Sequence, residues 1–272
     1  MKISNIFIGG LSVVVLLFIP LTTYAADAEP TQYSGWPLYW VDQFQGNSLD
    51  YNRWRVGYPW NSRTHNHEGY AIESNIVVED GILKLISGGG KSGNKYNTGV
   101  VSAIEKINFD DPNVEWIVEA RMKLSNRQGI WPAFWLNSVG GWPNINEIDI
   151  MEQKGWGSQA VYENVMHFSV QSGNRPSQHR TSSGPNNLDY NWHRYAVAIK
   201  KNEVKILFDG QTVNRVTGNR KDKLRRKDFN IILNAAIGGA WGGDSYKNWI
   251  DDYSKTARFA IDYVAVYRRS VN

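Results

Sequence analysis

Short runs of β-branched and aromatic residues, separated by Gly, Asn and Asp turns, are the feature that most limits the fold of this chain. Residues 115–124 alternate apolar side chains at even positions with mostly polar ones at odd positions, as on a strand with one face in the core. Two hairpins are predicted, by residues 75–79 and 82–87 around Asp80-Gly81 and by residues 195–200 and 204–208 around Lys201-Asn202. Residues 229–236 and 259–267 predict further strands, whereas the glycine-rich stretch 88–93 predicts a flexible loop. Since no long helical pattern occurs, the chain is predicted to be all-β, a sandwich or a barrel.

Length and composition favour one globular domain. The chain has 272 residues, 42% of them hydrophobic, which is enough for a sizeable core. It contains no cysteine, which excludes disulfides, thiolate catalysis and cysteine-ligated zinc. The net charge of +4 is too small to indicate a nucleic-acid partner. Basic residues are dense only at 220–227, where we expect a solvated loop, with contact to an anionic polysaccharide or surface as the alternative.

Residues 1–25 have the pattern of a secretory signal peptide. Lys2 gives a positive start, and the apolar stretch 6–21 is interrupted by Gly, Ser and Pro and is short for a membrane span. Thr23-Tyr24-Ala25 offers small residues at the two positions that a signal peptidase recognises. We therefore expect secretion to the extracellular space or the periplasm, no membrane association after cleavage, and one β-sandwich domain over residues 26–272. An uncleaved anchor is the alternative.

Three carboxylates occur within six residues, in Glu147-Ile148-Asp149-Ile150-Met151-Glu152. On a strand, Glu147 and Asp149 share one face, because successive side chains point to opposite faces. Strict alternation would turn Glu152 away, but one extra residue, a β-bulge at Ile150 or Met151, returns it to the acidic face. The two glutamates then lie ~13 Å apart along the strand. Side chains that lean together can bring the carboxyl groups to about 5–5.5 Å, the spacing of a retaining glycosidase.

Acids that alternate along a strand can also form a solvated sheet face without any function. The neighbouring tryptophans favour catalysis: Trp131-Pro132-Ala133-Phe134-Trp135 and Trp142 precede Glu147 closely. Indole faces stack on the C–H faces of sugar rings, so carboxylates flanked by tryptophans indicate a cleft that cleaves a sugar chain. The twelve tryptophans of the chain agree with such a cleft.

Together these two stretches resemble glycoside hydrolase family 16, and the extra residue resembles its bulged branch of laminarinases (endo-β-1,3-glucanases). Residues 41–50 and Trp54 resemble the opening strand of the family, residues 238–243 its glycine-tryptophan loop, and residues 261–267 its closing strand. The resemblance thus covers nearly the whole mature chain. It implies a jelly-roll β-sandwich of two curved antiparallel sheets, with a substrate cleft on the concave face.

The resemblance assigns catalysis to three residues. Glu147 is expected to be the nucleophile, Glu152 the acid/base, and Asp149 the group that tunes their ionisation. Three negative charges so close together disfavour full ionisation, so at least one carboxyl should stay protonated near neutral pH. Because the nucleophile must be ionised and the acid protonated, their environments must differ. His167, expected on the neighbouring strand, lies close to the acid group in the family; bracing the sheet is the alternative role.

Aromatic and polar side chains are predicted to bind the sugar chain: Trp131, Trp135, Trp142, Trp241, His167, Asn66 and Glu68. Trp135 is also a core candidate, since Phe134 and Trp135 must face opposite ways. Asn66-His67-Glu68 resembles an Asn-Asn-Glu stretch that reaches the non-reducing-side subsites in the family, with a histidine in the middle position. A metal site at His65 and His67 is an alternative that would need further ligands.

Many family members bind a structural calcium ion on the convex side, through an acid after the opening Asp and the Asp of the closing strand. Here Gln43 replaces the first acid while Asp262 remains. A neutral ligand lowers the affinity for a hard cation. We therefore expect no metal site and no required cofactor, with structural calcium as the alternative.

The sequence as a whole predicts an exported, monomeric, retaining endo-β-1,3-glucanase with a laminarin-like polysaccharide as its partner. The alternatives are a hydrolase of mixed-linkage glucan, agarose or carrageenan on the same fold, a transglycosylase, and a non-catalytic glucan-binding protein. The three acids favour an enzyme over a binding protein. Substrate choice depends on the cleft loops, which a fold does not determine.

Overall fold

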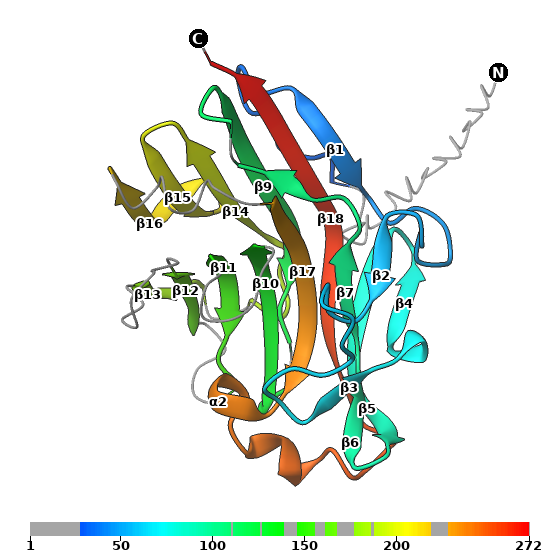
Figure 1. Cartoon of the computed structure of the whole chain (residues 1–272). Helices are drawn as coiled ribbons and strands as arrows, with labels where there is room; N and C mark the ends of the chain where they lie inside the picture. The colour runs from blue at the N-terminus through cyan, green and yellow to red at the C-terminus, as the bar shows by residue number, and fades with distance from the viewer. Residues whose placement is uncertain are drawn as a thin grey trace, which may run out of the picture.

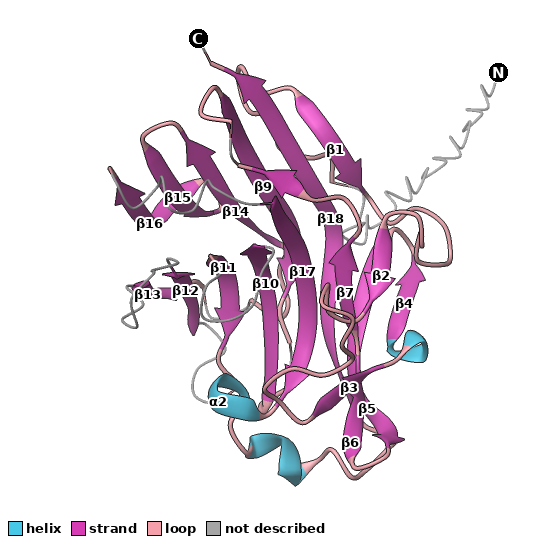
Figure 2. Ribbon diagram, viewed as in Figure 1, coloured by secondary structure: helices cyan, strands magenta, loops and turns pink. Residues whose placement is uncertain are grey.

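The computed structural model describes residues 28–109, 111–125, 127–138, 146–155, 161–167, 177–185, 188–218 and 228–271. The predicted signal peptide, Trp142 and the basic stretch 220–227 lie outside the described residues. The described part of the chain forms two large sheets (Figure 1), and only short helical turns interrupt the strands (Figure 2).

One sheet, here called the back sheet, has β9 and β18 at its centre. Its strands follow the order β16 (Gln211–Thr217), β15 (Glu203–Phe208), β14 (His193–Lys200), β9 (Val114–Lys123), β18 (Thr256–Ser270), β5 (Ile82–Ser92), β6 (Lys95–Thr98) and β3 (Gly69–Ala71). In addition, β1 (Leu38–Asp42) pairs with β18, and β4 (Ile76–Glu79) pairs with β5. Its pairings are antiparallel except that of β3 with β6.

The other sheet, here called the cleft sheet, carries the three acids on β11. Its order is β13 (Ser177–Ser183), β12 (Val161–His167), β11 (Glu147–Gln153), β10 (Ile130–Ser138), β17 (Asp228–Ile237), β7 (Val100–Ala103) and β2 (Trp54–Val56), and β8 (Ile107–Asn108) pairs with β17. The helical turns are η1 (Glu73–Asn75), α2 (Gly239–Gly242) and η2 (Ser245–Asn248), of which α2 directly follows β17. In Figure 1, α2 lies beside one end of the strands that form the cleft sheet.

The hydrophobic core lies between the two sheets. Val118 and Val264 enter it from the back sheet, and Phe134, Ile148 and Leu233 enter it from the cleft sheet, all with 0% of their surface exposed. Apolar side chains at every second position of these strands therefore hold the two sheets face to face. The predicted hairpins are β4–β5 and β14–β15, and the predicted all-β sandwich is confirmed.

The alternation predicted for residues 115–124 is present in β9, but its second face is not a solvated one. Tyr33 and Trp36, in the segment before β1, pack against the outer side of the back sheet. The hydroxyls of Tyr33 and Tyr263 donate hydrogen bonds of 2.5 and 2.7 Å to the two carboxylate oxygens of Glu119, which is only 1% exposed. The segment before β1 thus covers part of the outer face of the back sheet.

The prediction of a flexible loop at 88–93 was wrong, because β5 continues to Ser92 and pairs with β6. The pairing is irregular between Ser87 and Lys91, and the three consecutive glycines Gly88–Gly90 have φ values of 94°, 79° and 147°. Only glycine adopts such values without strain. The glycines therefore bend the strand through a bulge and do not end it. No helix in the described part of the chain is long and apolar enough to span a membrane.

Candidate active site

A β-bulge in β11 sets the direction of the three acids. Trp135 of β10 pairs with Asp149, but the preceding Phe134 pairs with Met151, so that Ile150 is an extra residue. The pairing with β12 skips at the same place, between Asp149 and Glu152. The predicted bulge is therefore confirmed, and it places Glu152 on the same face as Glu147 and Asp149.

The opposite face of β11 explains why the bulge is stable. Ile148, Ile150 and Met151 are all 0% exposed and belong to the core between the sheets. These three buried side chains stabilise the strand around the bulge, because turning any of them toward solvent would lose roughly 1.5–3 kcal/mol of burial free energy. The acids are thereby fixed on the outer face of the cleft sheet.

That outer face is hollowed into a cavity of about 810 Å³, with Glu147, Asp149 and Glu152 in its lining. The other lining side chains come from β10 (Trp131, Ala133, Trp135, Asn137), β12 (Val165, His167), β13 (His179), β17 (Asn234, Ala236), α2 (Trp241) and the loop between β2 and β3 (Tyr58, Trp60, His65, Asn66, His67). The cavity therefore crosses several strands, as a groove for an extended ligand does.

The surroundings of Glu152 disfavour its ionised form. It is 7% exposed, and the indole N–H of Trp131 donates a hydrogen bond of 3.0 Å to its Oε1. Burial, followed by the charges of Asp149 and Glu147, raises the pKa of Glu152 well above its usual range, against the opposing effect of the Trp131 hydrogen bond. Glu152 is thus held in the protonated form at a pH where an ordinary glutamate is ionised.

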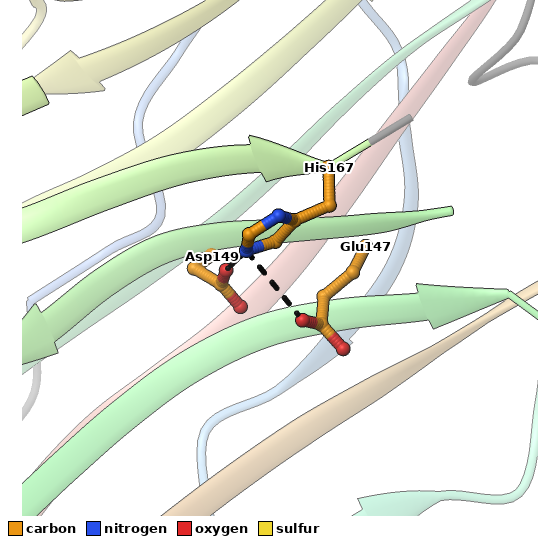
Figure 3. A group of neighbouring side chains, drawn as sticks. All are labelled: Glu147, Asp149 and His167. Atoms are coloured by element: carbon orange, nitrogen blue, oxygen red, sulfur yellow. Dashed lines mark ion pairs between the residues drawn. The ribbon is translucent and has the colours of Figure 1, made fainter. Parts of the chain in front are cut away.

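Glu147 and Asp149 share His167 as a partner (Figure 3). His167 Nε2 lies 3.5 Å from Asp149 Oδ2 and 3.9 Å from Glu147 Oε1, because His167 of β12 is the register partner of Glu147. The side-chain amide of Asn137 donates a hydrogen bond of 3.0 Å to the other carboxylate oxygen of Glu147. Glu147 thus accepts a hydrogen bond from Asn137, which favours its ionised form, and lies beside the imidazole of His167.

The same three groups, Glu147, Asp149 and His167, each bring one potential ligand atom within 4.8 Å of the others. Their contacts with one another and with Asn137 are those of an acid–base network, and we interpret them in this way. A cation site at His65 and His67 is disfavoured because both ring nitrogens of His67 are hydrogen-bonded, Nε2 with the Tyr58 hydroxyl and Nδ1 with the Gly69 N–H. Burial, helped by His65 and Lys95, lowers the pKa of His67 to about 3, so this ring is neutral.

Asp262, the remaining acid of the family's calcium site, is 2% exposed and forms an ion pair with Arg121 on the neighbouring strand β9. A guanidinium group therefore already supplies positive charge beside this carboxylate. The residues present, Gln43 and an Asp262 paired with arginine, do not fit a calcium site.

The predicted sugar-binding residues occupy different places. Trp131, Trp135, His167, Asn66 and Trp241 line the cavity, whereas Glu68 is not part of its lining and lies 3.8 Å from Lys95. Trp135 is both buried and in the cleft: it is 6% exposed, and its indole N–H donates a hydrogen bond of 2.7 Å to Asn234. Its neighbour Phe134 points into the core, as the alternation required.

An aromatic wall next to Trp135 was not predicted from the sequence. It consists of Tyr58, Trp60 and His65. The ring of Trp60 stacks on Tyr58 at 5.0 Å, and the ring of His65 stacks on Trp135 at 6.1 Å. Trp60 remains 43% exposed and so offers a face to a ligand. These residues belong to an irregular loop, where no periodic pattern could reveal their direction. Asn137 was predictable, since it shares the face of Trp131 and Trp135 on β10.

Comparison with known proteins agrees with this geometry. The family described as Glycosyl hydrolases family 16 matches residues 94–265, more than half of the chain. The chain is 30% identical over 264 residues to the Clotting factor G alpha subunit of Tachypleus tridentatus, covering 93% of this chain and 37% of that protein. It is 26% identical over 269 residues to Glucan endo-1,3-beta-glucosidase A1 of Niallia circulans, covering 86% of this chain and 38% of that protein. The chain thus spans less than half the length of these two relatives.

Among solved structures, one described as "Prominent members of the human gut microbiota express endo-acting O-glycanases to initiate mucin breakdown" matches with a TM-score of 0.76 and 26% sequence identity. The match covers 88% of this chain and 93% of that chain. The residues matched by the family include β10, β11 and β12, the strands that carry the three acids and their partners. From this match and the shared sandwich we conclude that the chain belongs to glycosyl hydrolases family 16.

Proposed function

We propose that the chain is an exported endo-β-1,3-glucanase that hydrolyses laminarin-like chains with retention of configuration. The observation that supports the proposal most directly is the bulged strand β11, which brings Glu147, Asp149 and Glu152 to one face of an elongated cavity. We further propose that residues 26–272 act as one monomeric catalytic domain that needs no metal ion or other cofactor.

In the proposed reaction, Glu147 is the nucleophile and Glu152 the acid/base. The carboxylate of Glu147 attacks the anomeric carbon, and Glu152 donates its proton to the glycosidic oxygen as the bond to the leaving sugar breaks. The result is a glycosyl ester on Glu147 and a free reducing-end product. Water then attacks the anomeric carbon and gives a proton to Glu152, so that both carboxyl groups return to their initial states. Two displacements at one carbon leave the β configuration unchanged.

The neighbours of the two glutamates support this division of roles. Glu147 accepts a hydrogen bond from the Asn137 amide, which favours a carboxylate, and His167 Nε2 lies 3.9 Å from its other oxygen. Glu152 is buried beside two other acids, which favour the neutral form. Two carboxyl groups whose surroundings drive their ionisation apart are the arrangement that an acid and a nucleophile require. Asp149, between them and beside His167, is proposed to tune this difference.

Cleavage within the chain is supported by the positions of the aromatic residues. The loop wall that contains Trp60 and the α2 residue Trp241 both line the cavity, although they come from segments far apart in the sequence. Trp60 packs against Trp135 of β10, and Trp241 packs against His179 of β13. Because β11 lies between these two strands, sugar rings can stack on either side of the acids. The names of relatives such as the Niallia circulans glucosidase support β-1,3-glucan as the substrate, whereas the O-glycanase structure keeps host glycans as a second candidate.

A substrate panel tests the proposal. Laminarin, lichenan, agarose, κ-carrageenan and O-glycosylated mucin would be incubated with the protein, and products separated by size. We expect laminarin to be cleaved fastest, with intermediate oligosaccharides appearing first, and proton NMR of the first minutes to show the β anomer before mutarotation. Fastest cleavage of another polymer would change the substrate, release of glucose alone would exclude endo cleavage, and an α anomer formed first would exclude the mechanism.

A further inference from the structure

A fourth carboxylate lies beside the acid/base and is used by none of the steps above. Glu163 of β12 is the register partner of Glu152 across the β11–β12 ladder and is 0% exposed. Directly opposed side chains of an antiparallel pair have Cβ atoms about 4.5–5.5 Å apart, and like charges at such positions repel each other. Two buried glutamates in this relation are compatible only if one of them is neutral or compensated.

Compensating partners surround Glu163. Lys154, just after β11, forms an ion pair with its Oε1. From β13, His179 Nε2 lies 2.5 Å from its Oε2, and the Thr181 hydroxyl is 2.9 Å from both carboxylate oxygens. Burial opposes the ionisation of Glu163, but Lys154, Thr181 and His179 together lower its pKa. Glu163 is therefore the ionised member of the pair, and Glu152 is the neutral one.

We propose that Glu163 is a positioning residue for the acid/base step: its fixed negative charge, opposite Glu152, keeps the proton on Glu152 until the leaving oxygen takes it. Glu163 does not line the cavity, so it acts through Glu152 and touches no substrate. The proposal rests on the acid/base role proposed for Glu152.

The other groups around Glu152 have separate effects that the experiment must distinguish. They are Glu147 and Asp149 on β11, Trp131 on β10, and, behind Glu163, Lys154, His179 and Thr181. Lys154 also lies 4.9 Å from the centre of the Trp241 ring, so changing it can alter substrate binding as well. For this reason the informative quantity is the pH dependence of kcat/KM and not its absolute value.

The basic limb of the kcat/KM profile on laminarin reports the loss of the proton from the general acid of the free enzyme. Glu163→Gln removes a negative charge opposite Glu152 together with the carboxylate that pairs with Lys154. This change favours ionised Glu152, so the basic limb is expected to move to lower pH by about one unit. Lys154→Met removes the positive charge and is expected to move the limb to higher pH. Glu163→Asp should restore the limb toward its original position.

A matched control is Glu203→Gln, which removes another carboxylate held by two cations, Lys205 and Arg215, but on β15 of the back sheet. It is expected to leave the limb unchanged.

A basic limb that stays in place in Glu163→Gln, or that moves in the same direction in Lys154→Met, would overturn the proposal. If Glu163→Gln does not fold, the shift in Lys154→Met decides alone. Glu152→Gln is assayed in parallel: if it remains active, the function proposed above fails, whereas an inactive Glu152→Gln with an unmoved limb in Glu163→Gln refutes only the role of Glu163.

Discussion

Two buried glutamates, one in each sheet, show how the same side chain serves stability in one place and chemistry in another. Glu119 of the back sheet is 1% exposed and accepts short hydrogen bonds from Tyr33 and Tyr263 on its two oxygens. Glu152 of the cleft sheet is 7% exposed, and Trp131 is the one hydrogen-bond donor that the described residues offer it, while other acids repel its charge. A satisfied carboxylate braces the fold; an unsatisfied one keeps a proton that it can give away.

The largest expected effect is on turnover. Glu147→Gln and Glu152→Gln should each lower kcat on laminarin by at least about a thousandfold, because the nucleophile and the acid are separate and essential parts of the reaction. Circular dichroism should show an unchanged fold. Near-normal turnover of either variant would contradict the proposed roles, and normal turnover of Glu152→Gln would also remove the functional difference between Glu152 and Glu119.

Asp149→Asn should have an intermediate effect. The side chain contacts His167 and raises the proton affinity of Glu152, and in the proposed mechanism it neither attacks nor protonates the sugar. We expect kcat to fall by about ten- to a hundredfold, less than for either glutamate. Steady-state kinetics of the three variants in one assay would check this order; a loss equal to that of Glu147→Gln would mean that Asp149 takes part in the chemistry itself.

On the back sheet, Glu119→Gln should lower the stability of the fold and leave turnover nearly unchanged. Replacing a carboxylate that accepts two tyrosine hydroxyls leaves one hydroxyl with a poor partner, which should cost about 1–3 kcal/mol of unfolding free energy. The kcat should change by no more than about twofold, since the site lies on the far side of the core. Urea titration measures the loss of stability and the laminarin assay measures kcat. A large loss of kcat with unchanged stability would contradict a structural role for Glu119.

The smallest effect concerns the pH dependence of stability. The pKa of Glu152 in the folded protein lies above its ordinary value, so between these two values the folded state binds more protons than the unfolded state. Stability therefore falls as pH rises through this window, a loss that Glu152→Gln removes. Between acidic and neutral pH, the denaturant midpoint of Glu152→Gln should increase relative to that of the wild type as pH rises. A constant difference would mean that Glu152 titrates normally.

The parts of the site that the sequence predicted are those carried by local patterns. Alternation together with one surplus residue was enough to predict the face of Glu147, Asp149 and Glu152, because both depend only on consecutive side chains. The same alternation could have assigned Asn137 to the cleft. The sandwich itself was predictable from its short strands and turns, although the choice of a jelly roll came from the family resemblance.

The remainder depends on contacts between distant segments. The wall of Tyr58, Trp60 and His65 meets Trp135 through a loop without periodicity. Glu163 is noticeable only once β12 is in register with β11, and its partners lie just after β11 and on β13. The glycines after Ser87 predict a loop by their composition, but pairing with β6 keeps them in a strand. Tertiary pairing decides each of these cases, and local sequence does not contain it.

The bulge in β11 makes this strand unequally sensitive to changes in its length. Removing one residue between Asp149 and Glu152 would restore plain alternation and still leave all three acids in the cleft, at the expense of one apolar side chain in the core. Adding a residue there would also restore plain alternation, but it would place the second glutamate four residues beyond Asp149, ~13 Å along the strand, and so farther from Glu147. Evolution can therefore shorten this strand and keep its chemistry, but lengthening it by one residue would separate the proton donor from the nucleophile.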